Sequence, residues 1–283
     1  MTSTHFTCGK YQLDLSNPRV MGIVNVTPDS FSDGGRYEST EKAVEHALQL
    51  VEEGADILDI GGESTRPGAT PVTLEEELRR VIPVIEKLSA VAGVPLSIDT
   101  YKPEVMRAAI AAGADIVNDV RALQEPGALE IVAASNAGVC LMHMQGTPQT
   151  MQIDPQYQDV VAEVKTFLAE RMQAANAVGI ANERIVLDPG FGFGKRTIHN
   201  IALLQQLQAI SGLGRPLLVG LSRKSVLGQI VGGDVYVRLH ASIAASVISA
   251  MKGARIVRVH DVKATADALK VVSAVLADNA LLY

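Results

Sequence analysis

The clearest chemical signal in the sequence is a short apolar run that ends in an acid and a glycine-rich loop. Residues 185–187 (IVL) are followed by Asp188 and then by the loop 189–195, which reads PGFGFGK. Such an apolar run is typical of a strand buried on both faces, and glycines let a backbone approach a ligand closely. The pattern predicts a buried strand that carries a carboxylate to a site at its C-terminal end. The alternative is that Asp188 only caps the turn after it.

Versions of this arrangement, an apolar run followed by a polar residue, recur along the whole chain. The polar residues at or just after the predicted strand ends are Asn25, Asp59, Asp99, Asn118, His143, Asp188, Lys224, Arg258 and His260. Any one of them could be a turn cap or half of a buried ion pair. A whole set converging on one place needs a ligand or one another, so together they predict a polar binding site.

The residue types indicate what the ligand offers. Carboxylate and amide groups can pair, two bonds at a time, with a flat heterocycle that carries an amino group beside a ring N–H. Cations and other donors suit phosphate. The first group comprises Asp99, Asn118 and Asp188, the second comprises Arg66, Arg258 and His260, and Lys224 suits either. These types predict a ligand with an aminated ring at one end and phosphates at the other.

The glycine-rich loop does not match the common nucleotide-binding motifs. A Walker A loop needs a glycine where Pro189 stands, and a Ser or Thr where Arg196 follows Lys195. The dinucleotide fingerprint GxGxxG also fails, because the spacing here is GxGxG. We therefore reject both nucleotide-binding interpretations.

Strands and helices that could position these groups alternate along the chain. A hairpin is predicted over residues 5–15, turning at Gly9-Lys10. Strands are predicted at 20–24, 57–60, 96–98, 116–117, 139–142, 185–187, 217–220 and 256–257. Helices are predicted from Thr40 to Gly54, from Thr73 to Val91, from Pro103 onward, and over 126–137, 157–178, 198–211, 225–231, 238–252 and 263–277.

This alternation determines the predicted fold. It produces parallel strands joined by crossover helices. Eight such units in 283 residues predict an α/β protein with a closed (β/α)8 TIM barrel, one domain over residues 1–283, and a short N-terminal β-hairpin. The alternative is an open doubly wound sheet. The barrel is favoured because polar residues end every strand, and all eight strand ends of a barrel face one site.

Composition excludes several other classes of protein. The net charge is −6 and no Lys/Arg block occurs, so we expect no nucleic-acid partner. The apolar stretches are too short to span a bilayer, and the N-terminus lacks a signal-peptide core. The only cysteines, Cys8 and Cys140, show neither metal spacing nor a disulfide framework. These features predict a soluble, cytoplasmic protein that binds no membrane.

Six motifs, in order, resemble the signatures of bacterial dihydropteroate synthases. They are NVTPDSFSDGG (25–35), GGESTRPGA (61–69), DTYKPEV (99–105), LDPGFGFGK (187–195), SRKS (222–225) and RVHDV (258–262). The resemblance covers residues 10–275. It implies a homodimeric transferase of folate biosynthesis that joins 6-hydroxymethyl-7,8-dihydropterin diphosphate to 4-aminobenzoate and is inhibited by sulfonamides. The products would be 7,8-dihydropteroate and diphosphate.

The resemblance also implies a role for each motif residue. Asp99, Asn118, Asp188 and Lys224 would hold the pterin, Arg66, Arg258 and His260 the diphosphate, and Asn25 the Mg2+ bound to it. Val259 would also belong to the substrate-binding residues. Thr65, Pro67, Phe31 and Ser225 would build the aminobenzoate pocket, which sulfonamides also enter. The loops 27–35 and 62–69 would close over the site. Ser225 lies where a helix is predicted to begin, which suits the aminobenzoate carboxylate; the alternative is a helix N-cap.

These assignments support a mechanism in which the diphosphate leaves first. Asp99 and Asp188 would stabilise the delocalised pterin cation, while Arg66, Arg258, His260 and Mg2+ would stabilise the leaving group. The catalytic set would thus be Asp99, Asp188, Lys224, Arg258 and His260. Because an aromatic amine is largely neutral at pH 7, no general base or covalent nucleophile is expected.

Two alternative functions stay open. A related pterin-binding barrel, such as a methyltransferase acting on methyltetrahydrofolate, would share the acids but need no diphosphate clamp. Asn25, Arg66 and residues 258–260 argue against it. A paralogue that binds pterin without turnover is the second alternative, and the intact loops argue against it. One departure from the family pattern lies at 234–241, with Ala241 in the usual Gly position, and it bears on the dimer interface.

Overall fold

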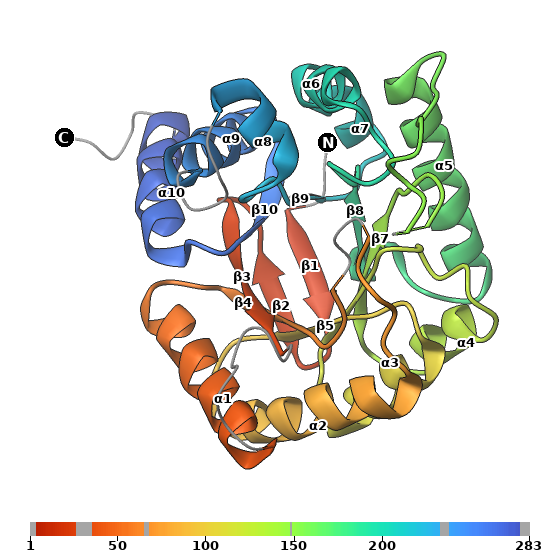
Figure 1. Ribbon diagram of the computed structural model, residues 1–283, viewed down its shortest axis with the longest axis vertical. Helices are drawn as coiled ribbons and strands as arrows, with labels where there is room; N and C mark the ends of the chain where they lie inside the picture. The colour runs from red at the N-terminus through yellow and green to blue at the C-terminus, as the bar shows by residue number, and fades with distance from the viewer. Residues whose placement is uncertain (1–3, 27–35, 65–67, 148, 233–237, 278–283) are drawn as a thin grey trace.

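The computed structural model describes residues 4–26, 36–64, 68–147, 149–232 and 238–277. Eight parallel strands close into a barrel in the order β10-β3-β4-β5-β6-β7-β8-β9, which confirms the predicted fold (Figure 1). The strands are β3 (Arg19–Asn25), β4 (Ile57–Gly61), β5 (Leu96–Asp99), β6 (Ile116–Asp119), β7 (Gly138–Met142), β8 (Ile185–Asp188), β9 (Leu217–Val219) and β10 (Ala254–Val259). Every predicted strand is present, and no strand end moves by more than two residues.

Helices cover the outside of the barrel (Figure 1). They are α1 (Arg36–Glu52), α2 (Leu74–Val91), α3 (Pro103–Ala112), α4 (Ala128–Ala133), α5 (Val160–Ala177), α6 (Thr197–Gln205), α7 (Leu207–Ser211), α8 (Ser225–Val231), α9 (Leu239–Met251) and α10 (Val262–Leu276). The short 3-10 helix η2 (Asn182–Arg184) precedes β8. No helix in the described ranges is long and apolar enough to cross a membrane.

Three helix predictions were wrong in their bounds. Helix α1 begins at Arg36, not Thr40, because Thr is tolerated inside a helix and need not cap it. Helix α4 is shorter than predicted, since Gly127 stands in the left-handed region before it and the Ser135 hydroxyl bonds the Val132 carbonyl after it. The predicted helix over 198–211 is two helices, because Gln206 leaves helical geometry between α6 and α7.

Alternate residues of each strand face opposite sides of the barrel wall. On β4, Leu58 and Ile60 pack in the core between strands and helices, whereas Ile57 packs in a second core inside the barrel. Asp59 therefore points inward, above Ile57, and it is completely buried. The same alternation carries the last inward-facing side chain of every strand to the C-terminal mouth of the barrel.

The predicted hairpin closes the opposite end of the barrel. Strands β1 (His5–Cys8) and β2 (Tyr11–Asp14) pair antiparallel around Gly9, which has φ of +53°. Phe6 and Cys8 pack against the inward-facing apolar residues of the strands, and β1 lies across the middle of the barrel in Figure 1. Gly138 makes room for the hairpin, because a Cβ there would lie 2.5 Å from Phe6 Cζ. Because this hairpin plug fills one end of the barrel with apolar side chains, the C-terminal mouth is the polar end of the barrel.

Candidate active site

A buried ion-pair network joins four strands at the barrel mouth. Arg258, on β10, places its Nε 2.5 Å from Asp59 Oδ2 on β4, and its Nη2 2.7 Å from Asp99 Oδ2 on β5. Asn118, on β6, donates from its Nδ2 to the same Asp59 oxygen at 3.1 Å. Four of the predicted strand-end residues therefore meet in one place, as the sequence pattern predicted.

The network sets the charge state of its members. Burial raises the pKa of Asp99 to about 7, although the Arg258 guanidinium acts against this rise. Burial alone would lower the pKa of Arg258, but the carboxylates of Asp59 and Asp99 outweigh that effect and raise it. Asp59 Oδ1 and Asp99 Oδ1 are buried without a hydrogen-bond partner. An unused buried acceptor is costly unless a ligand donor satisfies it.

Asp188 and Lys224 form a second charged group at the same mouth. Asp188 Oδ1 accepts the Gly190 N–H at 2.7 Å, so the turn cap that we considered as an alternative is present and engages this oxygen. Burial raises the pKa of Asp188, and the Lys224 ammonium acts against this rise. Burial lowers the pKa of Lys224 to about 8, against the pull of the Asp188 carboxylate. Hydrogen bonds from a polar ligand would therefore stabilise the charged forms of both groups.

The sequence analysis gave no role to two residues of the glycine-rich loop, Phe193 and Lys195. The Lys224 ammonium lies 4.5 Å from the centre of the Phe193 ring, and it donates to the Phe191 carbonyl. Lys195 is buried, with its Nζ 2.9 Å from the Gly190 carbonyl and 3.0 Å from that of Phe193. The sequence signal that could have identified these residues was the repeat GFGFG at 190–194, because it places two phenylalanines between glycines with a flexible backbone.

His143 does not join the mouth, which corrects the prediction for this strand end. Its Nδ1 lies 2.9 Å from Lys195 Nζ, and its ring packs edge-on against Phe167 of α5 at 5.0 Å. Burial, and secondarily Lys195, lower its pKa to about 3. The reason is strand alternation: Met142 ends β7, so the next side chain faces the helices.

The loops after β9 and β10 are tied together beside the mouth. The Ser222 hydroxyl accepts the main-chain N–H of His260 at 3.2 Å and lies 3.1 Å from its Nδ1. Arg223 has φ of +59° and forms a two-bond ion pair with Asp261, at 3.0 and 2.5 Å. These contacts fix the main chain on both sides of His260.

The other predicted residues occupy less central positions. Ser225 is the exposed first residue of α8, and Lys224 is the N-cap, so the N-cap alternative for Ser225 was wrong. The Val259 side chain is buried in the core between strands and helices, so it could meet a ligand only through its main chain. Asn25 is half-buried at the end of β3, beside Gly61 of β4.

Four predicted residues lie outside the described residues, namely Phe31, Thr65, Arg66 and Pro67. The loop 27–35 and residues 234–237 of the family departure also lie outside them. The start of the loop 62–69 is described. Glu63 there pairs with Lys102, which also pairs with the buried Glu77, and Arg80 Nη1 donates to the Gly62 carbonyl at 2.7 Å.

Residues 21–260 match the family model described as pterin binding enzyme. The chain is also 54% identical over 264 residues to the dihydropteroate synthase of Escherichia coli K12, an alignment that covers 93% of this chain and 94% of that one. The chain belongs to the dihydropteroate synthase family. The family membership removes the support for a methyltransferase.

Solved structures of family members agree with this assignment. The Xanthomonas albilineans dihydropteroate synthase with 4-aminobenzoic acid has a TM-score of 0.92 and 57% identity, covering 98% of this chain and 100% of that chain. The same enzyme with 7,8-dihydropteroate has a TM-score of 0.87 and 51% identity over 98% and 100%. The Yersinia pestis enzyme in a sulfonamide drug complex has a TM-score of 0.91 and 49% identity over 96% and 98%.

We predict that Asp188→Asn weakens pterin binding by about ten- to a hundredfold, because it removes a charge-assisted hydrogen bond. Calorimetric titration with 6-hydroxymethyl-7,8-dihydropterin measures the effect. Asp115→Asn is the control: this buried acid bonds the Leu96 N–H at 3.1 Å, at the opposite end of the barrel, and its loss should reduce stability but not affinity. Equal pterin affinity in Asp188→Asn and wild type would remove Asp188 from the site.

The pKa of Asp99 predicts a pH dependence of pterin binding. A carboxyl with a pKa of about 7 loses its charge as the pH falls through 7, and with it the ability to accept a strong hydrogen bond. We expect the affinity for 6-hydroxymethyl-7,8-dihydropterin to be about tenfold lower at pH 6 than at pH 8. In Asp99→Asn the dependence should be flat. A flat profile in the wild-type protein would show that the Asp99 charge is not used.

Proposed function

We propose that this protein is a dihydropteroate synthase. It condenses 6-hydroxymethyl-7,8-dihydropterin diphosphate with 4-aminobenzoate to give 7,8-dihydropteroate and diphosphate, a transferase reaction of folate biosynthesis. The observation that carries the proposal is the barrel mouth, where Asp99, Asn118 and Asp188 stand beside Arg258 and Lys224. The complexes of family members with 4-aminobenzoic acid and 7,8-dihydropteroate support it.

The pterin is held by the acceptors of the mouth. Asp188 keeps an oxygen that makes no turn bond, and Asp99 Oδ1 is a buried acceptor without a partner. Both suit the amino and ring N–H groups of a pterin. Asn118 adds its amide and Lys224 its ammonium on the same surface. The apolar cluster of Val120, Met142 and Phe193 would supply contacts for the faces of the flat ring.

The diphosphate lies toward Arg258 and His260 in this proposal. Arg258 lies on β10 and His260 directly follows this strand, where the bond between Ser222 and the His260 N–H fixes the main chain. The main chain of Val259 completes the segment, and the resemblance assigns Arg66 to the same anion. Planar guanidinium groups with several donors bind phosphate oxygens with good geometry.

The residues present fit a Mg2+ ion bound with the diphosphate. Mg2+ prefers oxygen ligands and keeps water and substrate phosphates in its shell, so a single protein ligand can suffice. Asn25 offers one amide oxygen at the end of β3, the strand that pairs with β10. The ion, when bound, would offset negative charge on the diphosphate.

The chain's own residues act mainly through charge in the reaction. Arg258 and His260 stabilise the negative charge that develops on the departing diphosphate, while Asp99 and Asp188 stabilise positive charge on the pterin. Lys224 orients the ring from above Phe193. The attacking aromatic amine is neutral near pH 7, so these residues need to remove no proton before bond formation.

The aminobenzoate pocket combines Ser225 with the loop residues Phe31, Thr65 and Pro67. Ser225 is exposed at the start of α8, next to Lys224, where its hydroxyl can donate to a carboxylate. Phe193 adds an aromatic wall. Sulfonamides would enter the same pocket, a proposal that the Yersinia pestis drug complex supports.

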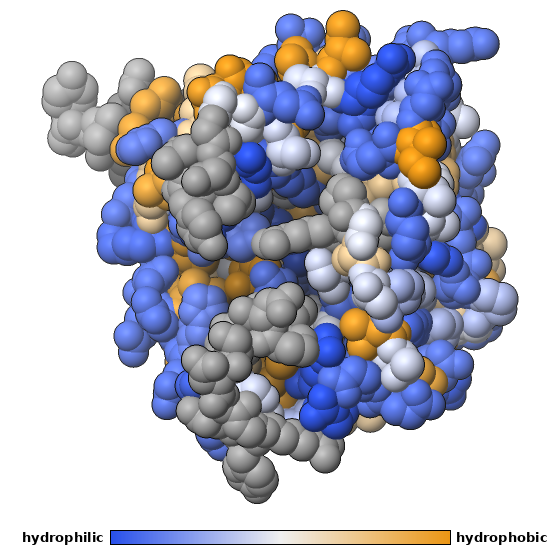
Figure 2. Space-filling view, in the orientation of Figure 1, coloured by the Kyte–Doolittle hydropathy of each residue, from blue (hydrophilic) through white to orange (hydrophobic). Residues whose placement is uncertain are grey.

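We further propose that the chain is a single domain over residues 1–283 that forms a homodimer in the cytoplasm. One closed barrel with its hairpin plug uses the described chain from His5 to Leu276. The unpaired, buried Cys8 and Cys140 suit a reducing compartment. Hydrophobic residues gather over α9 and α10 at the upper left of Figure 2.

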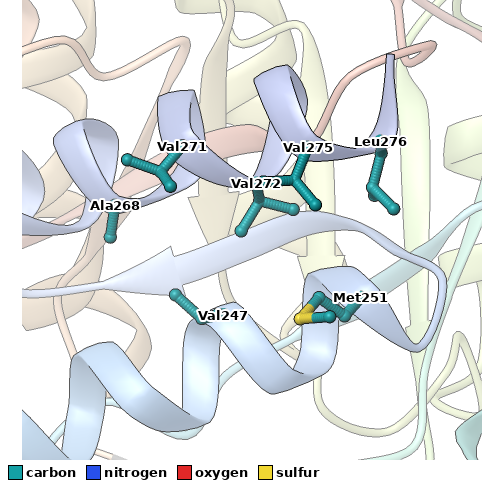
Figure 3. Close-up of a pocket in the computed structure, with 7 residues that line it drawn as sticks. All are labelled: Val247, Met251, Ala268, Val271, Val272, Val275 and Leu276. Atoms are coloured by element: carbon teal, nitrogen blue, oxygen red, sulfur yellow. The ribbon is translucent and has the colours of Figure 1, made fainter. Parts of the chain in front are cut away.

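The apolar groove between α9 and α10 is our candidate for the dimer interface. It has a volume of about 380 Å3 and only apolar lining residues: Val247, Met251, Ala268, Val271, Val272, Val275 and Leu276 (Figure 3). Val271, Val275 and Leu276 are 63%, 70% and 53% exposed. A contiguous exposed row of large apolar side chains on one helix is unusual in a monomer and is typical of a protein–protein interface. A second copy of this chain is the occupant that the family resemblance implies.

The function is tested by mixing the protein with pterin diphosphate, 4-aminobenzoate and Mg2+ and measuring diphosphate release and dihydropteroate formation. Dihydropteroate formation should need both substrates, and omission of 4-aminobenzoate is the control. Pterin binding without diphosphate release would show a non-catalytic paralogue and overturn the proposal.

For Ser225→Ala we predict a Michaelis constant for 4-aminobenzoate raised about tenfold, because a hydrogen bond to a carboxylate is lost. The Michaelis constant for pterin diphosphate should stay within about twofold. Ser273→Ala, a half-exposed serine on α10, is the control for general effects of serine loss. Wild-type aminobenzoate kinetics in Ser225→Ala would rule out this position for the carboxylate.

The dimer interface is tested with Val275→Glu, which places a charge on the groove. We predict that sedimentation analysis finds a dimer for the wild type and a monomer for the variant, because a charge buried in an apolar interface is unfavourable. Val91→Glu is the matched control, since Val91 is 61% exposed at the end of α2, on another helix. A dimer that survives Val275→Glu would place the interface elsewhere.

A further inference from the structure

In the described part of the chain, Asp59 is a fully buried carboxylate that contacts two of the residues assigned to ligand binding. Its Oδ2 accepts from Arg258 Nε at 2.5 Å and from Asn118 Nδ2 at 3.1 Å. It is 0% exposed and lies below the mouth, at the level of Ser97 on the neighbouring strand. Because Asp59 lies one layer below Asp99, its contacts with Arg258 and Asn118 are the route by which it would act on a ligand in the mouth.

The first partner is fixed in one amide orientation. An ionised carboxylate only accepts hydrogen bonds, so Asn118 must turn its NH2 group toward Asp59. Asn118 Oδ1 is then left as the group that faces the ligand. Asn118 Oδ1 then offers an acceptor to a ring N–H or amino group of the ligand.

The second partner is fixed along one edge of its guanidinium. Nε is held by Asp59 and Nη2 by Asp99, whereas no described residue accepts a hydrogen bond from Nη1. An arginine held at Nε can release Asp99 and turn Nη2 toward an anion without losing its anchor. The unused Nη1 group already offers two donors to that anion.

From these contacts we infer that Asp59 is a positioning residue of the synthase: it aims Arg258 at the diphosphate and presents Asn118 to the pterin as an acceptor. The inference rests on the proposed function for the identity of the two ligand parts. It differs from a purely structural role, because it predicts unequal effects on a pterin with and without its diphosphate.

The test compares the binding of two ligands, 6-hydroxymethyl-7,8-dihydropterin and its diphosphate, to wild type, Asp59→Asn and Ser97→Ala. In Asp59→Asn the affinity for the free pterin should fall about tenfold, because the oriented bond from Asn118 is lost. The affinity for the pterin diphosphate should fall about a hundredfold, because the bond from Arg258 is lost as well. Ser97→Ala is matched for depth, because the Ser97 hydroxyl is buried without a partner, and both affinities should stay unchanged.

A reciprocal exchange provides the rescue. In Asp59→Asn/Asn118→Asp the new amide donates to the new carboxylate, which still faces the ligand as an acceptor, and the total charge is conserved. Free-pterin affinity should return to within about threefold of wild type. Equal losses for both ligands in Asp59→Asn, or unchanged affinities with a lower melting temperature, would overturn the inference and leave Asp59 a structural residue.

A measurement on the wild-type protein covers the case in which the variant does not fold. The Arg258 Nε–H signal in 15N NMR, assigned by its loss in Arg258→Lys, should stay protected from solvent exchange before and after pterin diphosphate is added. Loss of protection on binding would contradict the anchor. These binding and exchange measurements need no turnover, so a failure of the proposed reaction would be seen separately, in the diphosphate-release assay.

Discussion

The structure of the site depends on one buried arginine between two carboxylates. Arg258 bonds Asp59 and Asp99 inside a barrel where unpaired charges would be strongly destabilising. Without the guanidinium, the acids that a pterin needs could not remain ionised so close together. Arg258 therefore serves folding and ligand binding with the same donors. Asp59 Oδ1 and Asp99 Oδ1 remain buried acceptors without a hydrogen-bond partner.

The rest of the fold keeps this network dry and at a fixed height. The hairpin fills the lower end of the barrel with Phe6 and Cys8, so the charged groups lie on an apolar floor. The loop after β8 is held from behind by Lys195, whose ammonium bonds the carbonyls of Gly190 and Phe193. That loop supplies the Phe191 carbonyl to Lys224. The apolar packing of the hairpin and the buried Lys195 thus position the two cations of the mouth, Arg258 and Lys224.

The sequence predicted the strands and their polar ends because both follow from local patterns. Apolar runs of buried strands are readable without tertiary context, and the six family motifs covered the site. Side-chain direction was harder to predict. Asp188 is the last residue of its strand, whereas His143 is the first residue after its strand. A shift of one residue turns a side chain to the other side of the barrel wall, so the His143 ring faces α5. Asp119 likewise turns outward and bonds the Arg121 and Leu123 N–H groups. The roles of Phe193 and Lys195 needed three-dimensional contacts between segments far apart in sequence.

The central claim, that Arg258 compensates the buried acids, is tested most directly by the pH dependence of unfolding in Arg258→Met. Arg258 lowers the pKa of Asp99, so without it that pKa should rise further above about 7. A raised pKa in the folded state means that stability is lost as the pH rises toward it. Urea unfolding should show a loss of about 3–5 kcal/mol relative to wild type at pH 9 and a smaller loss at pH 6. Arg255→Met, on the same strand with its guanidinium on the exposed Ser16 carbonyl, should show little loss at either pH. Equal losses for Arg258→Met at both pH values, or none, would contradict the account.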